Sequence, residues 1–189
     1  MRKLFVTIML LLSALVFAPD LLDRRTVKEA ERQLHDAFLA DRSNMYKIDL
    51  NVMHFMRITE SQNNPNEREF SKDEKTGKYI LDENGQKIVI SRGYFQLCDA
   101  TIVDYCKEKR IIQPSRETRI EMAYNPYWNT EITCWVIAKY LRIFRGDYKA
   151  ALSAHNMGLT AFLDYREQTG FRFYPPYIAK IRKAGAKDL

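Results

Sequence analysis

Glu60 is the residue whose type and position point most directly to chemistry. It follows an apolar segment, 46–59, that we expect to be a helix, and a polar turn at 62–66 comes next. A general acid for a glycosidic oxygen must hold its proton near neutral pH, and partial burial among apolar side chains raises the pKa of a carboxyl. Met53, Met56 and Ile58 are suited to supply such surroundings. The pattern suggests glycoside chemistry with Glu60 as the acid. The alternative is a solvated glutamate without a catalytic role, which is the commoner case at a helix end.

Other titratable side chains define the alternatives. A second carboxylate that faced Glu60 would permit attack by water, whereas a solvated one would have no such role. The candidates lie in or beside the segment after Glu60, and they are Asp73, Glu74, Asp82 and Glu83. The three histidines, His35, His54 and His155, do not have the spacing of a metal-ligand set. We therefore expect no metal and no cofactor.

The elements that must position Glu60 are mostly helices, with one β-hairpin inserted after it. Runs rich in apolar residues at 78–81 and 87–90 flank an Asn-Gly pair, which is a strong hairpin signal. Asp99, Ser115 and Asp147 are expected to cap helices, and Pro126 to stand in the first turn of a long one. The expected helices cover 26–43, 46–59, 99–107, 115–122, 125–145, 147–158, 160–170 and 177–183.

The N-terminal residues have the charge order of an export signal. Met1-Arg2-Lys3 is basic, and 4–18 is an uncharged run that is short for a membrane span. Val16-Phe17-Ala18 offers a cleavage site, but Pro19 disfavours cleavage there. We therefore expect export to the periplasm or cell envelope, with the leader either removed or kept as an anchor in the inner membrane.

Charge and cysteine content restrict the partners. The formal net charge is +6 and the pI is about 9.2, which favours anionic partners. No nucleic-acid-binding motif is present in the sequence, so we expect no nucleic acid. Cys98, Cys106 and Cys134 lack metal-type spacing and leave the disulfide pairing open.

Four segments, read in order, resemble the catalytic domain of soluble lytic transglycosylases, a family with a goose-type lysozyme fold. The family pattern is a Glu-Ser pair, a Gly-Leu-Met-Gln segment, an Ala-Tyr-Asn-x-Gly segment and a late Tyr. The turn Asn64-Pro65-Asn66 and the approach 150–153 also match, and the resemblance covers about 46–183. The matching segments here are Glu60-Ser61, Ser91-Arg92-Gly93-Tyr94-Phe95-Gln96, Ala154-His155-Asn156-Met157-Gly158 and Tyr177-Ile178.

The resemblance implies roles for individual residues. Glu60 would protonate the leaving oxygen between N-acetylmuramic acid and N-acetylglucosamine, and would then act as base on the muramoyl C6 hydroxyl. That hydroxyl closes a 1,6-anhydro ring, so neither water nor a second carboxylate is needed. Tyr177 would direct its hydroxyl at Glu60, or would be a core aromatic. Ser61 would support Glu60 or a sugar N-acetyl group, or would cap its own helix.

Further implied roles concern substrate binding. Gly93 would let the chain approach the sugar closely, because glycine has no Cβ. Gln96 and Asn156 would bind sugar or brace the cleft.

Three of the matching stretches contain departures or additions to the family pattern, at His155, at Tyr94-Phe95 and at Ser91-Arg92. His155 replaces the usual Tyr, which either introduces a titration near neutral pH beside the sugar or is a packing variant. Tyr94 and Phe95 replace smaller residues, so we expect reshaped sugar subsites. Ser91-Arg92 places a cation that either meets an anionic muramoyl group or is exposed without such a role.

Together these observations predict a mainly α, lysozyme-like α+β domain with one small β-hairpin after the catalytic Glu, preceded by an N-terminal signal or anchor segment. The expected division is 1–22 signal peptide or membrane anchor, 23–45 N-terminal helix or spacer, and 46–189 catalytic domain. The expected activity is that of a peptidoglycan lytic transglycosylase acting on glycan strands. The alternatives are a hydrolytic lysozyme of the same fold, and a catalytically inactive wall-binding subunit of an envelope-spanning assembly. Such an assembly would be secretion or conjugation machinery, or a phage device that enters cells.

Overall fold

The computed structural model describes residues 24–73, 75–186 and 189, in two compact units. One unit ends at Phe38 and the other is Leu39–Leu189. The expected leader, 1–22, and Glu74 lie outside the described residues. No helix within the described part of the chain has both the length and the apolar character to cross a membrane.

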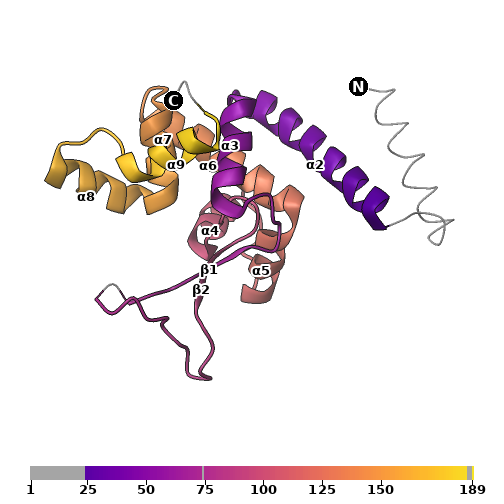
Figure 1. Ribbon diagram of the computed structural model, residues 1–189, viewed down its shortest axis with the longest axis horizontal. Helices are drawn as coiled ribbons and strands as arrows, with labels where there is room; N and C mark the ends of the chain where they lie inside the picture. The colour runs from indigo at the N-terminus through magenta and orange to yellow at the C-terminus, as the bar shows by residue number, and fades with distance from the viewer. Residues whose placement is uncertain (1–23, 74, 187–188) are drawn as a thin grey trace. The chain divides into compact units, whose positions relative to one another are not determined.

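The described residues are mainly helical, with one small antiparallel sheet, as the sequence predicts. The elements, labelled in Figure 1, are α2 (Arg24–Tyr46), α3 (Leu50–Ser61), β1 (Arg68–Phe70), β2 (Val89–Arg92), α4 (Asp99–Glu108), α5 (Arg116–Tyr124), α6 (Pro126–Ile143), α7 (Tyr148–Met157), α8 (Leu159–Thr169) and α9 (Pro175–Ala184). Within the unit Leu39–Leu189, α6 packs against α4, α5 and α7, and α3 packs against α9.

Helix α3 carries Glu60 in its last turn. The helix begins after Asp49, whose carboxylate accepts a hydrogen bond from the Asn51 amide. It therefore starts later than the predicted residue 46, because Asp49 caps it. It ends as predicted: Gln62 takes a left-handed conformation and its amide donates to the Ile58 carbonyl. Glu60 is thus fixed to a rigid element immediately before the chain changes direction.

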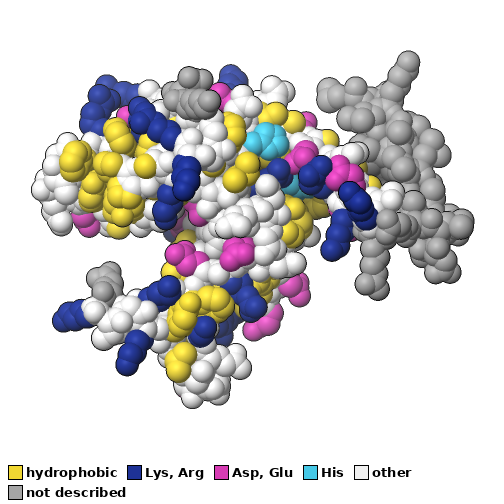
Figure 2. Space-filling view, in the orientation of Figure 1, with side chains coloured by type: hydrophobic (Ala, Val, Ile, Leu, Met, Phe, Trp, Pro, Cys, Tyr) yellow, Lys and Arg dark blue, Asp and Glu magenta, His cyan; other side chains and the backbone are white. Residues whose placement is uncertain are grey.

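The predicted turn forms, and β2 overlaps the second predicted strand at Val89 and Ile90, but the partner of β2 is β1 and not 78–81. The chain reverses at 82–86, where the Asp82 amide donates to the Gln86 carbonyl at 2.8 Å. The predicted strand 78–81 makes only isolated bridges, whereas β1 and β2 form the regular ladder. The reason is burial: β2 is buried at Ser91 and Arg92, while residues 79–88 are exposed. The segment 71–88 between the two strands is called the excursion below, and hydrophobic and basic side chains lie side by side on it (Figure 2).

Helix capping agrees with the sequence at most positions. Ser115, Asn125 and Asp147 each accept amide hydrogen bonds at the start of α5, α6 and α7. Asp99 is the exception, because it is the first residue of α4 and Cys98 occupies the cap position. Its carboxylate is instead paired with buried Arg92.

Candidate active site

Two adjoining hollows meet at Glu60. One has a volume of about 270 Å³ and the other about 250 Å³. Both are lined by Glu60, Glu69, Gln96 and Asn156, so they are two arms of one cleft. The first arm also contains Thr59, Glu67, Arg68, Tyr177 and Lys180. The second also contains Ile90, Ser91, Cys98, Thr101, Val136, Tyr140, His155, Met157 and Gly158.

The Glu60 carboxyl is held in a state suited to proton donation. Burial raises its pKa to about 7, and the negative charge of Glu69 acts in the same direction. The hydrogen bond from Tyr177 and the charge of Lys180 lower the pKa, but they do not offset the burial. The carboxyl therefore gains and loses its proton near neutral pH.

Tyr177 donates its hydroxyl to Oε1 of Glu60. Its ring extends from α9 into the core cluster that also contains Met53 and Met56 of α3, and burial raises the pKa of its hydroxyl well above the ordinary value. The hydroxyl therefore stays protonated and remains a donor. Tyr177 is thus a core aromatic whose hydroxyl also contacts Glu60, and its part in catalysis stays a prediction.

Gln96, Ser91 and Glu69 form a hydrogen-bonded chain across the sheet. The Gln96 amide nitrogen donates to the Gly93 carbonyl at 2.8 Å, which turns Oε1 of Gln96 toward Ser91. The Ser91 hydroxyl lies 2.9 Å from that oxygen and 3.1 Å from Oε2 of Glu69. One hydroxyl proton meets two acceptors, so one of them is left to accept a hydrogen bond from a ligand.

Gly93 is required by the packing behind the cleft. It has a φ of +79°, and a Cβ there would lie 2.2 Å from the Ala123 carbonyl oxygen and 2.5 Å from Nδ2 of Asn129. Asn129 is fully buried and binds the segment through the Phe95 amide and the Arg92 carbonyl. The close approach of Gly93 is therefore to its own protein, and its approach to a sugar stays a prediction.

Asn129 was missed from the sequence. The one signal in the sequence is that Asn129 carries an amide side chain within the apolar helical segment that forms α6. A polar group buried in such a segment needs hydrogen-bond partners.

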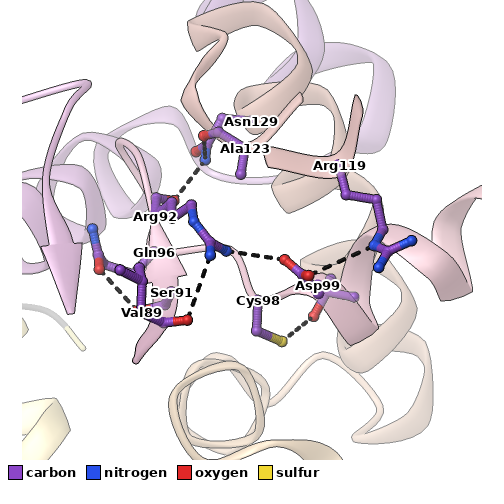
Figure 3. A network of polar contacts seen from close by, with 10 residues as sticks. Val89, Ser91, Arg92, Gln96, Cys98, Asp99, Arg119, Ala123 and Asn129 are labelled. Carbon is purple, nitrogen blue, oxygen red and sulfur yellow. Dashed lines mark hydrogen bonds and ion pairs between the residues drawn. The ribbon is translucent and has the colours of Figure 1, made fainter. Parts of the chain in front are cut away.

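Arg92 is neither exposed nor directed at a ligand, in contrast to both sequence expectations. It is buried, and its guanidinium donates to Asp99 at 3.0 Å (Figure 3). Arg119 lies 3.6 Å from the other oxygen of Asp99. A buried cation needs a paired anion, so this network serves to anchor β2 and the start of α4.

Tyr94 and Phe95 are core residues and line neither hollow. This corrects the expectation that their bulk reshapes a sugar subsite directly. The reason is the turn at Gly93, after which both side chains pack with Met53 and Met56 of α3. Any influence on the substrate therefore passes through the position of α3.

Ser61 is buried, and its hydroxyl donates to the Arg57 carbonyl of its own helix at 3.0 Å. The structure thus gives the second of the two sequence alternatives, a bond to the helix backbone. Asn156 is exposed and lines both hollows, where it is available to a ligand.

His155 lines the second hollow and is neutral at physiological pH. Its Nε2 lies 3.1 Å from the Phe95 carbonyl oxygen, and burial lowers the pKa of the ring to about 4. Because a carbonyl only accepts, Nε2 carries the proton and Nδ1 is an acceptor. The structure therefore moves the expected titration of His155 away from neutral pH.

Glu69 is the carboxylate that lines both hollows together with Glu60, and the sequence reasoning missed it. Of the carboxylates proposed for this role, Asp73, Asp82 and Glu83 line neither hollow. Glu69 lies on β1 opposite Ser91, and this pairing across the sheet brings it to Glu60. No local signal marks it, because its position depends on a partner strand distant in sequence.

Cys98, Cys106 and Cys134 are free thiols, and Cys98 lines the second hollow. Among the residues that the structure describes, no group of three or more His, Cys, Asp or Glu side chains is placed to hold a metal ion.

Comparison with known proteins assigns the family. None of the curated proteins matches the chain significantly. The family model described as the transglycosylase SLT domain matches residues 38–174, which include the whole cleft except the late α9 residues. Domains of this family are lytic transglycosylase-like and act on peptidoglycan. The chain therefore belongs to the transglycosylase SLT domain family.

Proposed function

We propose that this protein is a peptidoglycan lytic transglycosylase in which Glu60 is the single acid and base. The observation that carries the proposal is the partly buried Glu60 carboxyl, with a pKa of about 7 and a Tyr177 hydroxyl bound to it, at the junction of two arms of a cleft. A glycan strand lying along both arms would place its scissile bond at this junction.

In the first step the protonated Glu60 gives its proton to the glycosidic oxygen. The bond between that oxygen and C1 of N-acetylmuramic acid breaks, and the leaving N-acetylglucosamine keeps the bonding electrons. Positive charge develops on the muramoyl ring, as in other glycoside cleavages. The Tyr177 hydroxyl stabilises the carboxylate that Glu60 becomes.

In the second step the Glu60 carboxylate takes the proton of the muramoyl C6 hydroxyl. The C6 oxygen forms a bond to C1, which closes the 1,6-anhydro ring, and Glu60 is again protonated. The overall change is an intramolecular transfer that consumes no water.

A hydrolytic lysozyme is the second candidate, and Glu69 is the observation that favours it. Glu69 lines both arms together with Glu60. A carboxylate so placed is able to activate a water molecule for attack on C1. The two mechanisms leave different sugar ends, 1,6-anhydro ends for the transglycosylase and reducing ends for the hydrolase.

We also propose the cellular setting that the sequence indicates. The protein is exported to the periplasm or cell envelope by 1–22, which is either cleaved or kept as an inner-membrane anchor, and 46–189 is the catalytic domain. The basic net charge of +6 suits a wall polymer whose stem peptides carry carboxylates. A locally acting enzyme of this size suits an envelope-spanning assembly as its partner. Retention of binding without cleavage would instead make it a wall-binding subunit.

Release of soluble fragments from purified peptidoglycan tests the activity. We expect Glu60→Gln to reduce release at least about a thousandfold, since the proton donor is lost. Glu83→Gln is the matched control, because Glu83 is an exposed carboxylate of the excursion that lines neither hollow. Equal release by wild type and Glu60→Gln would refute the assignment of Glu60.

A further inference from the structure

Glu69 has an arrangement unlike that of an ordinary surface carboxylate on a strand. Its cross-strand neighbour is the buried Ser91, and the Ser91 hydroxyl lies 3.1 Å from Oε2 of Glu69. Within the described part of the chain Glu69 makes no ion pair; the adjacent Arg68 lies instead over the Phe70 ring, at 5.8 Å. The carboxylate is therefore tethered by a hydroxyl proton that it shares with Gln96, and no described ion pair neutralises it.

The link through Ser91 connects Glu69 to the fixed part of the cleft. Ser91 also contacts Gln96, whose amide is anchored on the Gly93 carbonyl. The segment around Gly93 is itself bound by buried Asn129. A negative charge held in this way keeps its position relative to Glu60, whereas a free surface side chain would move away from it.

The charged and titratable groups that face Glu60 come from three parts of the fold. Helix α9 contributes the Tyr177 hydroxyl and the Lys180 ammonium. The sheet and its approach contribute Glu69, and Glu67 and Arg68 line the same arm. Helix α7 contributes His155, which is neutral above about pH 4. Lys180 favours ionisation of Glu60 and Glu69 opposes it.

We propose that Glu69 is a positioning residue of this site. Its carboxylate, bound across the sheet by Ser91, opposes the ionisation of Glu60 by like charge and so keeps Glu60 protonated for cleavage. The inference deepens the proposed function and rests on it for its consequence in catalysis. It assigns a use to the small sheet, which is to hold a second carboxylate beside the first.

The direct test is the titration of the Glu60 carboxyl carbon by NMR in the ligand-free protein, with Glu60→Gln used to assign its signal. We expect Glu69→Gln to lower the pKa of Glu60 by about half a pH unit or more, a roughly threefold change in proton affinity. Ser91→Ala, which frees the Glu69 side chain, should give a smaller shift in the same direction. Glu67→Gln is the matched control, because it removes the same charge from the same arm without touching the Ser91 link.

A shift with Glu69→Gln no larger than that with Glu67→Gln would overturn the proposal. The shift should also shrink in high salt, as a charge–charge effect does. This measurement needs no substrate, so it stands apart from the fate of the proposed activity.

The pH profile of peptidoglycan cleavage gives the second readout. Cleavage requires protonated Glu60, so activity falls as pH rises through its pKa. In Glu69→Gln this decline should begin at lower pH by the same half unit, whatever the change in the maximal rate. Loss of activity at every pH, together with reducing ends in the wild-type products, would contradict the proposal, because Glu69 would then be a direct catalyst.

Discussion

Replacing Glu60 with Gln should change how the stability of the protein depends on pH. Burial places the pKa of Glu60 at about 7 in the folded protein, against 4.5 ordinarily. A carboxyl with a raised folded pKa contributes stability that is fully present below the unfolded pKa and is lost as pH rises through the folded one. The window for this loss therefore runs from about pH 4.5 to about pH 7.

The size of the effect follows from the same two values. Between about pH 5 and about pH 8.5 the wild type should lose on the order of 2–3 kcal/mol of unfolding free energy that the Glu60→Gln variant keeps. The amide of Gln still accepts the Tyr177 hydroxyl, and other groups titrate in both proteins, so constant effects cancel between the two pH values. The stability of Glu60→Gln relative to wild type should therefore rise by that amount from the lower to the higher pH.

Urea denaturation at the two pH values measures this difference. Glu67→Gln is the control, because Glu67 lines the same arm and is hydrogen-bonded by the Asn64 amide. A difference between wild type and Glu60→Gln that stays within about 0.5 kcal/mol at both pH values would mean that Glu60 is solvated. The proposed proton donor would then have no physical basis.

Three other substitutions test neighbouring parts of the site. Tyr177→Phe removes a donor to the Glu60 carboxylate; cleavage should fall about 10- to 100-fold and its decline at alkaline pH should move upward, which a kcat–pH profile measures. Gly93→Ala should lower the unfolding free energy measured in urea by more than about 2 kcal/mol, because the new Cβ would meet the Ala123 carbonyl oxygen. Gly85→Ala is the control: Gly85 also has a positive φ but lies in open space, so its replacement should cost about 1 kcal/mol. Equal costs for the two substitutions would contradict the packing argument. Burial lowers the pKa of His155 to about 4, so His155 makes the stability of the protein fall as pH drops from about 6.5 toward 4. His155→Tyr should therefore reduce the loss of Tm on acidification. An unchanged loss of Tm would be inconsistent with a buried neutral ring.

The parts of the fold that were predictable from the sequence depend on neighbouring residues. The end of α3 after Glu60 is set by the Asn- and Pro-rich turn directly following it. The starts of α5 and α7 are set by the capping side chains of Ser115 and Asp147. These signals act within a few residues, so one sequence contains all of their physical cause.

The parts that were not predictable depend on distant partners. The Asn-Gly turn was correctly placed, but regular pairing formed between β1 and β2 at the base of the excursion, where burial favours it. Asp99 is a residue type that often caps helices, but its carboxylate pairs with Arg92 instead. No local sequence rule predicts that ion pair.

The same distinction applies to the candidate site. Glu60, Gln96, Asn156 and Tyr177 were singled out by resemblance, and the structure brings them to one cleft. Glu69 was not, because only its pairing with Ser91 across the sheet gives it a place there.

The masses of the sugar ends released from peptidoglycan in ¹⁸O-labelled water test the central claim most directly. If the Glu60 carboxylate takes the proton of the C6 hydroxyl and the C6 oxygen closes the ring, the wild-type products carry 1,6-anhydro ends without ¹⁸O. The Glu60→Gln variant should then release almost no sugar fragments. Reducing ends that contain ¹⁸O would show that water is the nucleophile and would contradict the account.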